Sequence, residues 1–318
     1  MRDSTNMAND PFADILKLTK TESLVTGGFT AGGPWAVRFP APDKIKFFAV
    51  VKGHCWVAID GEEKPIHAET GDVGLLAAKR SFVLASDLSV TPVEAMSLPF
   101  TGNGSKFAKI GEGEDFTQIG GHILLDPVSG RLLADALPPW IHVQASSPQA
   151  ASFRWLLDEL VNEQTSDLPG ASLASAQLAQ LLFIQILRAH LKTSGPLSPG
   201  WLRALGDPHL APALRLMHGD PGRSWHLEDL AKAAAMSRTA FAVRFKLVTG
   251  VPPLTYLLNW RMRLAERALH EGKTSISSLA QTLGYTSESA FSNAFKRVKG
   301  SAPRRYRDAK QPATNSLQ

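Results

Sequence analysis

Apolar and polar positions change their period along the chain, and the change divides it into two parts. Up to about residue 145, short runs alternate between apolar and polar side chains, as in half-buried β-strands. Residues 35–39, 47–51, 54–59 and 73–76 are examples, separated by Pro, Gly and Asp turn signals. The pattern predicts a small antiparallel β-barrel in residues 1–145.

Beyond residue 145 the apolar positions recur every three to four residues, which is the period of helices. Phe153, Leu156, Leu157 and Leu160 form one apolar stripe, and residues 178–191 form a wider one. We expect a helical connector whose second helix either pairs with another subunit or is buried within its own chain. Pro and Gly in residues 194–200 break helices, so a linker is expected there.

One pattern occurs twice near the C-terminus, at an offset of fifty residues. Lys246, Gly250, Pro253 and Tyr256 recur as Lys296, Gly300, Pro303 and Tyr306, and Phe241 and Phe245 recur as Phe291 and Phe295. In each copy two short amphipathic helices are joined by a turn, the arrangement of a DNA-binding helix-turn-helix. Residues 255–269 read as one long helix of roughly 22 Å, which could separate the two units by about one DNA turn, roughly 34 Å.

Two Phe residues four positions apart must face the same side of a helix, so the opposite side of each second helix is free to enter a major groove. In the first copy Arg238, Thr239, Ala242 and Val243 face outward, and in the second Glu288, Ser289, Ser292, Asn293, Lys296 and Arg297 lie on the outer face or at its end. Thr239, Ala242 and Val243 suit thymine methyl groups, which predicts fewer direct base contacts and more dependence on DNA shape in the first half.

Basic residues are concentrated in the same region. Residues 201–318 contain 18 Lys or Arg against 8 Asp or Glu, a net charge of +10, whereas residues 1–200 carry a net charge of −5. Contacts with phosphates supply most of a protein's non-specific affinity for DNA. Taken alone, the charge fits a solvated helix face equally well, but within the repeat it favours DNA binding.

Residues 207–308 resemble the DNA-binding domain of the AraC/XylS family of bacterial transcription regulators. The matching residues are Gly284-Tyr285, Ser287, Ser289, Phe291, Phe295-Lys296, Gly300, Pro303 and Tyr306-Arg307. The resemblance implies that both second helices lie in major grooves, which adds Arg244 and Lys246 to the first set. Asn293 stands where the family often has Arg, and because Asn prefers adenine while Arg binds guanine, the family's base preference does not carry over there.

The first part of the chain resembles the cupin-type sensor domain found in a branch of that family. The resemblance rests on Gly33-Pro34-Trp35, Gly71-Asp72, Ala85-Ser86-Asp87, Gly120-Gly121-His122 and Leu137-Pro138-Pro139. The expected fold class is α+β: a cupin-like antiparallel barrel, then helices, then an all-α tandem helix-turn-helix domain. The expected domains are a sensor at 1–145, a connector and dimerisation segment at 146–200, a DNA-binding domain at 201–310 and a disordered tail at 311–318.

A cupin fold raises the question of a metal enzyme, which would need several inward-facing His and carboxylate ligands. Phe47 and Phe48 stand where the first ligand pair would lie, and Phe82 stands where a later His is expected. We therefore expect no metal, no cofactor and no enzymatic activity; the alternative is a cupin-type metal enzyme with an appended DNA-binding domain. Phe48 and Phe82 either line a pocket for a small apolar effector or simply fill the barrel.

The single cysteine, Cys55, excludes an internal disulfide and fits a buried strand better than a redox sensor. No apolar run approaches the roughly 20 residues of a transmembrane helix, and the N-terminus does not read as a signal peptide. The sequence thus predicts a cytoplasmic, effector-responsive transcription regulator. Its expected partners are double-stranded DNA, a second copy of itself and, if it is an activator, RNA polymerase.

Overall fold

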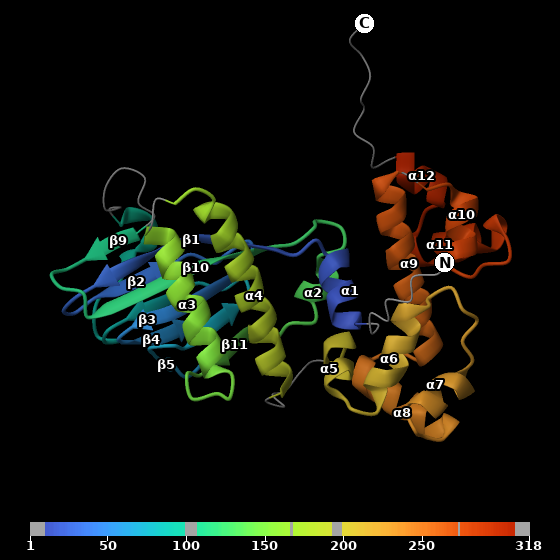
Figure 1. Cartoon of the computed structure of the whole chain (residues 1–318), viewed down its shortest axis with the longest axis horizontal. Coiled ribbons are helices and arrows are strands. Elements are labelled where there is room, and N and C mark those ends of the chain that lie inside the picture. Colours follow the sequence, from blue (N-terminus) through green and yellow to red (C-terminus); the bar gives the residue numbers. More distant parts are fainter. Residues whose placement is uncertain (1–9, 99–106, 166–167, 193–198, 273, 309–318) are drawn as a thin grey trace, which may run out of the picture. The chain divides into compact units, whose positions relative to one another are not determined.

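A computed structural model describes residues 10–98, 107–165, 168–192, 199–272 and 274–308. Most of the linker expected at 194–200 and all of the tail expected at 311–318 lie outside the described residues. The chain divides into two compact units (Figure 1). The sheet unit comprises the described residues of Lys20–Asp126 and Leu137–Pro196, and the helical unit comprises those of Met1–Thr19, Pro127–Ala136 and Leu197–Gln318.

The sheet unit contains eleven strands, a short 3₁₀ helix and two α-helices among its described residues. The strands are β1 (Glu22–Ala31), β2 (Ala36–Phe39), β3 (Ile45–Lys52), β4 (His54–Ile59), β5 (Ile66–Glu69), β6 (Val73–Leu76), β7 (Phe82–Ala85), β8 (Val93–Glu94), β9 (Phe107–Ile110), β10 (Phe116–Leu124) and β11 (Trp140–Val143). The 3₁₀ helix is Ala95–Ser97, and the helices are α3 (Ala150–Thr165) and α4 (Ala171–Lys192).

The strands form two sheets with the orders β11-β6-β3-β10-β1-β9 and β5-β4-β7-β2-β8. Pairing is antiparallel except for β1 with β9 and β2 with β8. The expected α+β class, with a sheet-rich cupin region and a helical C-terminal region, is confirmed. The expected closed barrel is corrected to two sheets, because each sheet ends in edge strands instead of returning to its own first strand.

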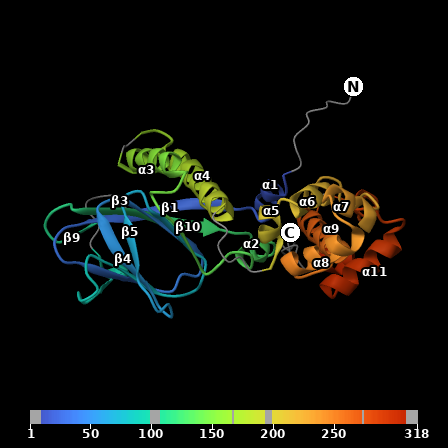
Figure 2. The ribbon, with the colours of Figure 1, turned by 90° about the horizontal axis from the view of Figure 1, so that it is seen from below.

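The core of the sheet unit lies between these two sheets. Phe29 and Phe48 come from the six-stranded sheet, and Val57, Phe82 and Leu84 come from the five-stranded one; all five belong to one buried cluster. The alternating pattern of β4 buries every second side chain, as period-two patterning requires. Helix α4 packs on β1 and α3 on β3, so both cover the outer side of the six-stranded sheet (Figure 2). This cover explains why β3 and β6 are apolar on both faces.

The helical unit contains ten α-helices in its described residues. They are α1 (Pro11–Leu18), α2 (Arg131–Ala134), α5 (Trp201–Gly206), α6 (Leu210–Gly219), α7 (Leu227–Ala233), α8 (Arg238–Thr249), α9 (Pro253–Glu271), α10 (Ile276–Thr282), α11 (Glu288–Lys299) and α12 (Pro303–Asp308). The predicted central helix is α9, whose 19 residues span about 28 Å.

Two short segments from the first half of the sequence pack with the helical unit. Helix α1 contacts α5 and α6, and the ring of Phe12 lies 6.5 Å from that of Trp201. The indole nitrogen Nε1 of Trp201 donates a 2.9 Å hydrogen bond to the carbonyl of Leu132 in α2. The chain therefore passes between the two units at residues 19/20, 126/127 and 136/137, and once more between α4, which ends at Lys192, and α5, which begins at Trp201.

Candidate functional site

The two repeated units of the helical part have the same construction. A helix of 7 residues, α7 or α10, precedes one of 12 residues, α8 or α11. The hydroxyl oxygens of Ser237 and Ser287 accept hydrogen bonds from backbone amides in the first turns of α8 and α11, the usual role of a serine N-cap. Gly250 and Gly300 then end the helices in the left-handed conformation, at φ 82° and 80°.

The inner face of each second helix is formed by the repeated Phe pair, and all four Phe side chains are fully buried. The repeated tyrosines have matching roles as well. The ring of Tyr256 packs edge-on against Phe245 at 5.6 Å, and that of Tyr306 against Phe295 at 5.4 Å. This fixed inner face orients the opposite face of each helix toward solvent, as the sequence pattern predicts.

On α8 most of the expected DNA-contacting residues lie on the outer face. Arg238, Thr239 and Lys246 are exposed, Ala242 is partly exposed, and Val243 keeps 65% of its surface accessible. Arg238 pairs with Glu228 at 2.8 Å, but both side chains remain largely in solvent. Arg244 differs because its guanidinium binds the carboxylate of Asp207 through Nε at 2.9 Å and through a terminal nitrogen at 2.8 Å.

On α11 the six expected residues lie on the solvent side together. Glu288, Ser289, Asn293, Lys296 and Arg297 are exposed, and Ser292 is partly exposed. Arg304 and Arg305 in α12 are also exposed, so basic side chains continue beyond the end of α11. Lys299 is instead paired with Glu266 of α9, which also accepts a hydrogen bond from the hydroxyl of Tyr306. Through these two interactions Glu266 connects both α11 and α12 to α9.

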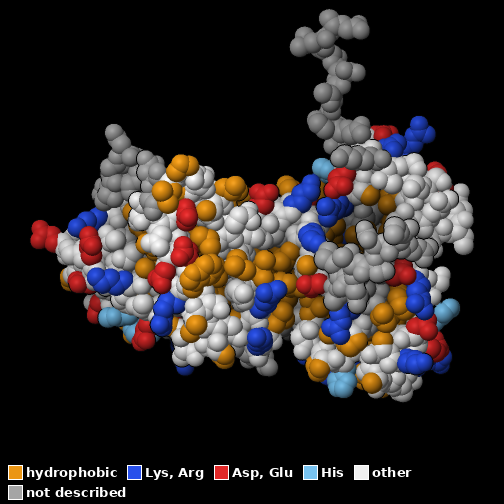
Figure 3. Space-filling view, viewed as in Figure 1, with side chains coloured by type: hydrophobic (Ala, Val, Ile, Leu, Met, Phe, Trp, Pro, Cys, Tyr) orange, Lys and Arg blue, Asp and Glu red, His pale blue; other side chains and the backbone are white. Residues whose placement is uncertain are grey.

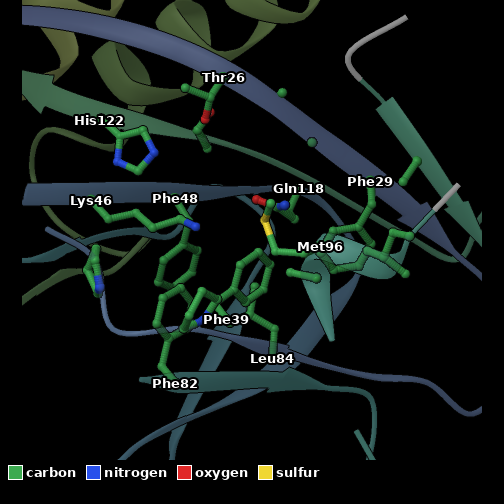
Figure 4. A pocket seen from close by; sticks show the side chains of 18 of the residues that line it. Thr26, Phe29, Phe39, Lys46, Phe48, Phe82, Leu84, Met96, Gln118 and His122 are labelled. Atoms are coloured by element: carbon green, nitrogen blue, oxygen red, sulfur yellow. The ribbon is translucent and has the colours of Figure 1, made fainter. Parts of the chain in front are cut away.

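The sheet unit contains a cavity of about 450 Å³ between its two sheets. Phe48 and Phe82, the pocket residues expected from the sequence, both line it, together with Phe39 and Leu84 (Figure 4). Phe39 and Phe82 are stacked, with ring centroids 4.8 Å apart and planes 8° from parallel. The cavity is in the size range of small-molecule sites, and most of its lining is apolar.

One end of the cavity is polar, a feature that the sequence reasoning missed. Lys46 and His122 are register partners on the adjacent strands β3 and β10, and both line the cavity with Gln118. Burial lowers the pKa of Lys46 to about 8. Burial and the nearby lysines also lower the pKa of His122. The spacing of Lys46 and Phe48 could have predicted this polar end, because residues two positions apart on a strand lie on the same face. Lys46 therefore shares its strand face with Phe48, which lines the cavity.

The positions discussed for metal and redox chemistry are apolar or buried. Phe47, Phe48 and Phe82 are buried, and no three His, Cys, Asp or Glu side chains in the described part of the chain gather as a metal site. Cys55 is fully buried, and burial raises the pKa of its thiol to about 12, which opposes thiolate formation. Among the described residues, no helix is long and apolar enough to cross a bilayer.

Two protein-family models match the chain. One, described as cupin, matches residues 10–192, and one, described as helix-turn-helix domain, matches residues 230–309. A putative AraC-like transcription regulator of Streptomyces lividans is 43% identical over 94% of this chain and 98% of its own length. A protein of the same description from Streptomyces antibioticus is 41% identical over 95% of this chain and 100% of its own.

Among solved structures, the DNA-binding domain of the global transcriptional factor AdpA in complex with a target DNA is 33% identical to the matched part. The match covers 32% of this chain and 92% of that one, with a TM-score of 0.31. The cupin match extends over more than half of the chain, and the two Streptomyces relatives align with it over nearly their whole lengths. The chain therefore belongs to the AraC family of DNA-binding transcription regulators and has an N-terminal cupin domain.

Proposed function

We propose that α8 and α11 enter two neighbouring major-groove segments on one face of a duplex, and that a small molecule in the cavity of the sheet unit controls this binding in the cytoplasm. The observation that carries the proposal is the duplication itself. Two equal helices present solvent-facing side chains, while each is held by two buried Phe rings and one Tyr ring. Recognition helices of helix-turn-helix proteins are supported in this way.

The two helices would read DNA differently. Helix α8 offers the methyl groups of Thr239, Ala242 and Val243, which suit thymine methyls and depend on groove shape. Helix α11 offers hydrogen-bonding groups in Ser289 and Asn293, and an Asn in the groove prefers adenine. Lys296 and Arg297 are placed at the end of α11 for phosphate contacts.

The test is a nuclease footprint of the purified protein on the intergenic DNA beside its own gene, at two salt concentrations and with competitor DNA. We expect a protected stretch of about two turns that survives the competitor. Asn293→Ala should lose protection in one half only, whereas Gln281→Ala on the exposed side of α10 should keep both halves. Diffuse, salt-sensitive coating with and without the effector would refute sequence-specific reading.

The effector part of the proposal rests on the cavity between the sheets. Its walls include Phe48 and Phe82, and closely packed cores seldom leave a void of this size. Phe48→Ala and Phe82→Ala remove aromatic walls from opposite sheets, so each should weaken the response of a reporter gene to the inducing compound. Normal responses in both variants, at normal protein levels, would mean that the two rings only fill the core.

We infer that the chain acts through DNA and not by catalysis. Its relatives are named transcription regulators, and apolar side chains occupy the positions where a metal cupin would hold its ligands. Elemental analysis of the purified protein is the direct check. We expect less than one tenth of an equivalent of any transition metal, on the order of a contaminant. A stoichiometric metal would revive the alternative of a cupin-type metal enzyme with a DNA-binding domain.

The connector helices support a homodimer. Trp155 on α3 is 54% exposed, and it lines a shallow hollow with Leu181 on α4, which is also exposed. Hydrophobic side chains gather over these helices in Figure 3. Sedimentation at micromolar concentration should show dimers, and Trp155→Glu should give monomers that keep their melting temperature.

If the protein is an activator, run-off transcription with purified RNA polymerase should rise on its addition.

A further inference from the structure

The polar end of the cavity is formed by side chains from two neighbouring strands. Lys46 on β3 faces His122 on β10 in register, so both project from the same face of the sheet. Gln118 lies four residues before His122 on β10 and shares that face. Figure 4 shows Lys46 extending into the cavity toward the aromatic walls. Its Nζ lies 4.2 Å from the ring centroid of Phe39 and 5.4 Å from that of Phe82.

These polar groups have no protein partners that would satisfy them. Among the described residues no carboxylate forms an ion pair with Lys46; its contacts of opposite polarity are the faces of two Phe rings. Two further atoms of the lining, Nδ1 of His122 and Oε1 of Gln118, are buried without a hydrogen-bond partner. A partly buried cation without an ion-pair partner and buried unpaired polar atoms cost free energy, which a ligand of complementary charge would offset.

The lining also limits the charge of such a ligand. Among the described lining residues the only carboxylate is Asp43, which is exposed and close enough to His122 to oppose the lowering of its pKa, so it disfavours a ligand with a second acidic group. His122 is largely neutral because its pKa is lowered, and it can donate one hydrogen bond without adding charge. Lys46 thus supplies one positive charge, which matches one negative charge.

We infer that the cavity binds an amphipathic monoanion, whose apolar body packs on Phe39, Phe48 and Phe82 and whose single acidic head is held by Lys46 and His122. The inference rests on the proposed effector function and names the ligand class of that site. It differs from the expectation of a purely apolar effector, because an uncharged hydrocarbon would cover the partly buried Lys46 without pairing its charge. A charge-assisted hydrogen bond at this position adds selectivity for the acid over its neutral analogue.

Two fluorescent probes with the same apolar body provide the test. The probe 8-anilino-1-naphthalenesulfonate carries one sulfonate, and N-phenyl-1-naphthylamine is the same molecule without it. We expect the full-length protein to bind the sulfonate at least about tenfold more tightly, which is about 1.4 kcal/mol. Lys46→Met should abolish this preference while it leaves the affinity for the neutral probe unchanged within about twofold.

Matched variants separate the charge of Lys46 from other effects. Lys46→Arg keeps the charge and should keep the preference, and Lys52→Met removes an exposed lysine at the other end of β3, away from the cavity lining, and should change neither affinity. The melting temperature of Lys46→Met should fall little, because methionine removes a partly buried charge without an ion-pair partner and keeps an apolar contact with the Phe rings. These controls also exclude a general electrostatic effect of the basic helical unit.

The possible failures are distinct. If the neutral probe binds and the sulfonate has no advantage, or if Lys46→Met keeps the advantage, the monoanion inference is wrong while the effector cavity stands. If neither probe binds the wild-type protein, the cavity is closed to ligands, and the proposed effector function fails together with the inference.

Discussion

Arg244 on α8 shows how a single basic side chain at an outward position is also engaged within the fold. It lies among the outward positions expected to contact DNA, but its guanidinium binds Asp207, whose side chain is only 9% exposed. The position fifty residues later in the repeat is Ala294, which is buried. The two residues at this position of the repeat therefore have different structural roles: Arg244 forms an ion pair, and Ala294 is buried.

This difference gives a prediction about stability. Arg244→Ala should lower the free energy of unfolding of the helical unit by about 1 kcal/mol or more, because it leaves the nearly buried carboxylate of Asp207 unpaired. Arg238→Ala breaks a pair between two exposed side chains and should change it by less than about 0.5 kcal/mol. Urea unfolding measures both. Equal effects would show that the Arg244 pair is no stronger than a surface pair.

His218 is a second residue whose surroundings determine its behaviour. Its ring stacks on Trp260 at 4.0 Å, its Nε2 lies 2.9 Å from the hydroxyl of Tyr256, and its Nδ1 lies 3.9 Å from the carboxylate of Asp14, too far for a hydrogen bond. Burial lowers the pKa of His218 to about 3. The ring is therefore neutral in the folded protein at neutral and mildly acidic pH.

The pKa of His218 predicts how acid affects the fold. Between about pH 6.5 and the folded pKa, the unfolded chain binds a proton that the folded chain does not, so stability falls as the pH falls. Unfolding free energies of the wild type should decrease from pH 7 to 5, on the order of 1 kcal/mol per pH unit. His218→Gln should flatten this slope, and His209→Gln, at an exposed site, should not. A wild-type curve that is level over this range would contradict a buried neutral His218.

Among the strands and helices, sequence patterning predicts those whose shape depends on residues that are close in the chain. The runs at 54–59 and 73–76 are β4 and β6 to the residue, and the Phe pairs predicted the inner faces of α8 and α11. Strand β10 was not predicted as a strand because Gly120 and Gly121 weaken strand propensity. The structure supplies the reason: a Cβ on Gly121 would lie 2.0 Å from the carbonyl oxygen of Leu24 on β1. Only the paired strands reveal that close approach.

In the candidate site, too, features set by residues close in the chain could be predicted, and features set by long-range strand pairing could not. The outer faces of α8 and α11 follow from helical period alone, because the buried Phe pairs fix the rotation of each helix. The polar end of the cavity depends on the register that sets Lys46 opposite His122, although 76 positions separate them in the chain. A single sequence gives no signal for such long-range pairing. For the same reason the packing of α1 on α5 and α6 was not anticipated.

The turns inside the two helix-turn-helix units differ, and the difference is testable. Gly284, which follows α10, has φ +77°, and a Cβ there would lie 1.8 Å from the carbonyl oxygen of Gly222. Ala235, which follows α7, also has positive φ, at +52°, but carries a side chain. Gly284→Ala should lower the unfolding free energy by more than about 2 kcal/mol, since it combines backbone strain with a clash.

Ala235→Gly is the matched control, because glycine relieves strain at this position. It should alter the unfolding free energy by less than about 1 kcal/mol. Thermal unfolding of both variants, with circular dichroism to confirm helix content, makes the comparison. Similar stabilities for the two proteins would show that the approach of Gly222 and Gly284 does not constrain the fold.

In the molecule as a whole, the sheet unit that contains the cavity and the helical unit are connected by the chain at several points. Helix α1 belongs to the helical unit and ends at Leu18; strand β1 begins at Glu22, and its residues Thr26 and Phe29 line the cavity. Only three residues separate the two elements. This short connection is a covalent route by which the proposed effector could act on the helical unit.

We propose above all that α8 and α11 read two major-groove segments at a spacing fixed by α9. Binding affinity for operators with altered spacing tests it most directly, once the footprint has defined the site. Insertion of about five base pairs between the two half-sites turns one of them to the opposite face of the duplex, and about ten moves it one turn away. We expect a loss of at least about a hundredfold in affinity for both insertions. Unchanged affinity for either operator would contradict it, because the two helices would then not read the DNA as one rigidly spaced pair.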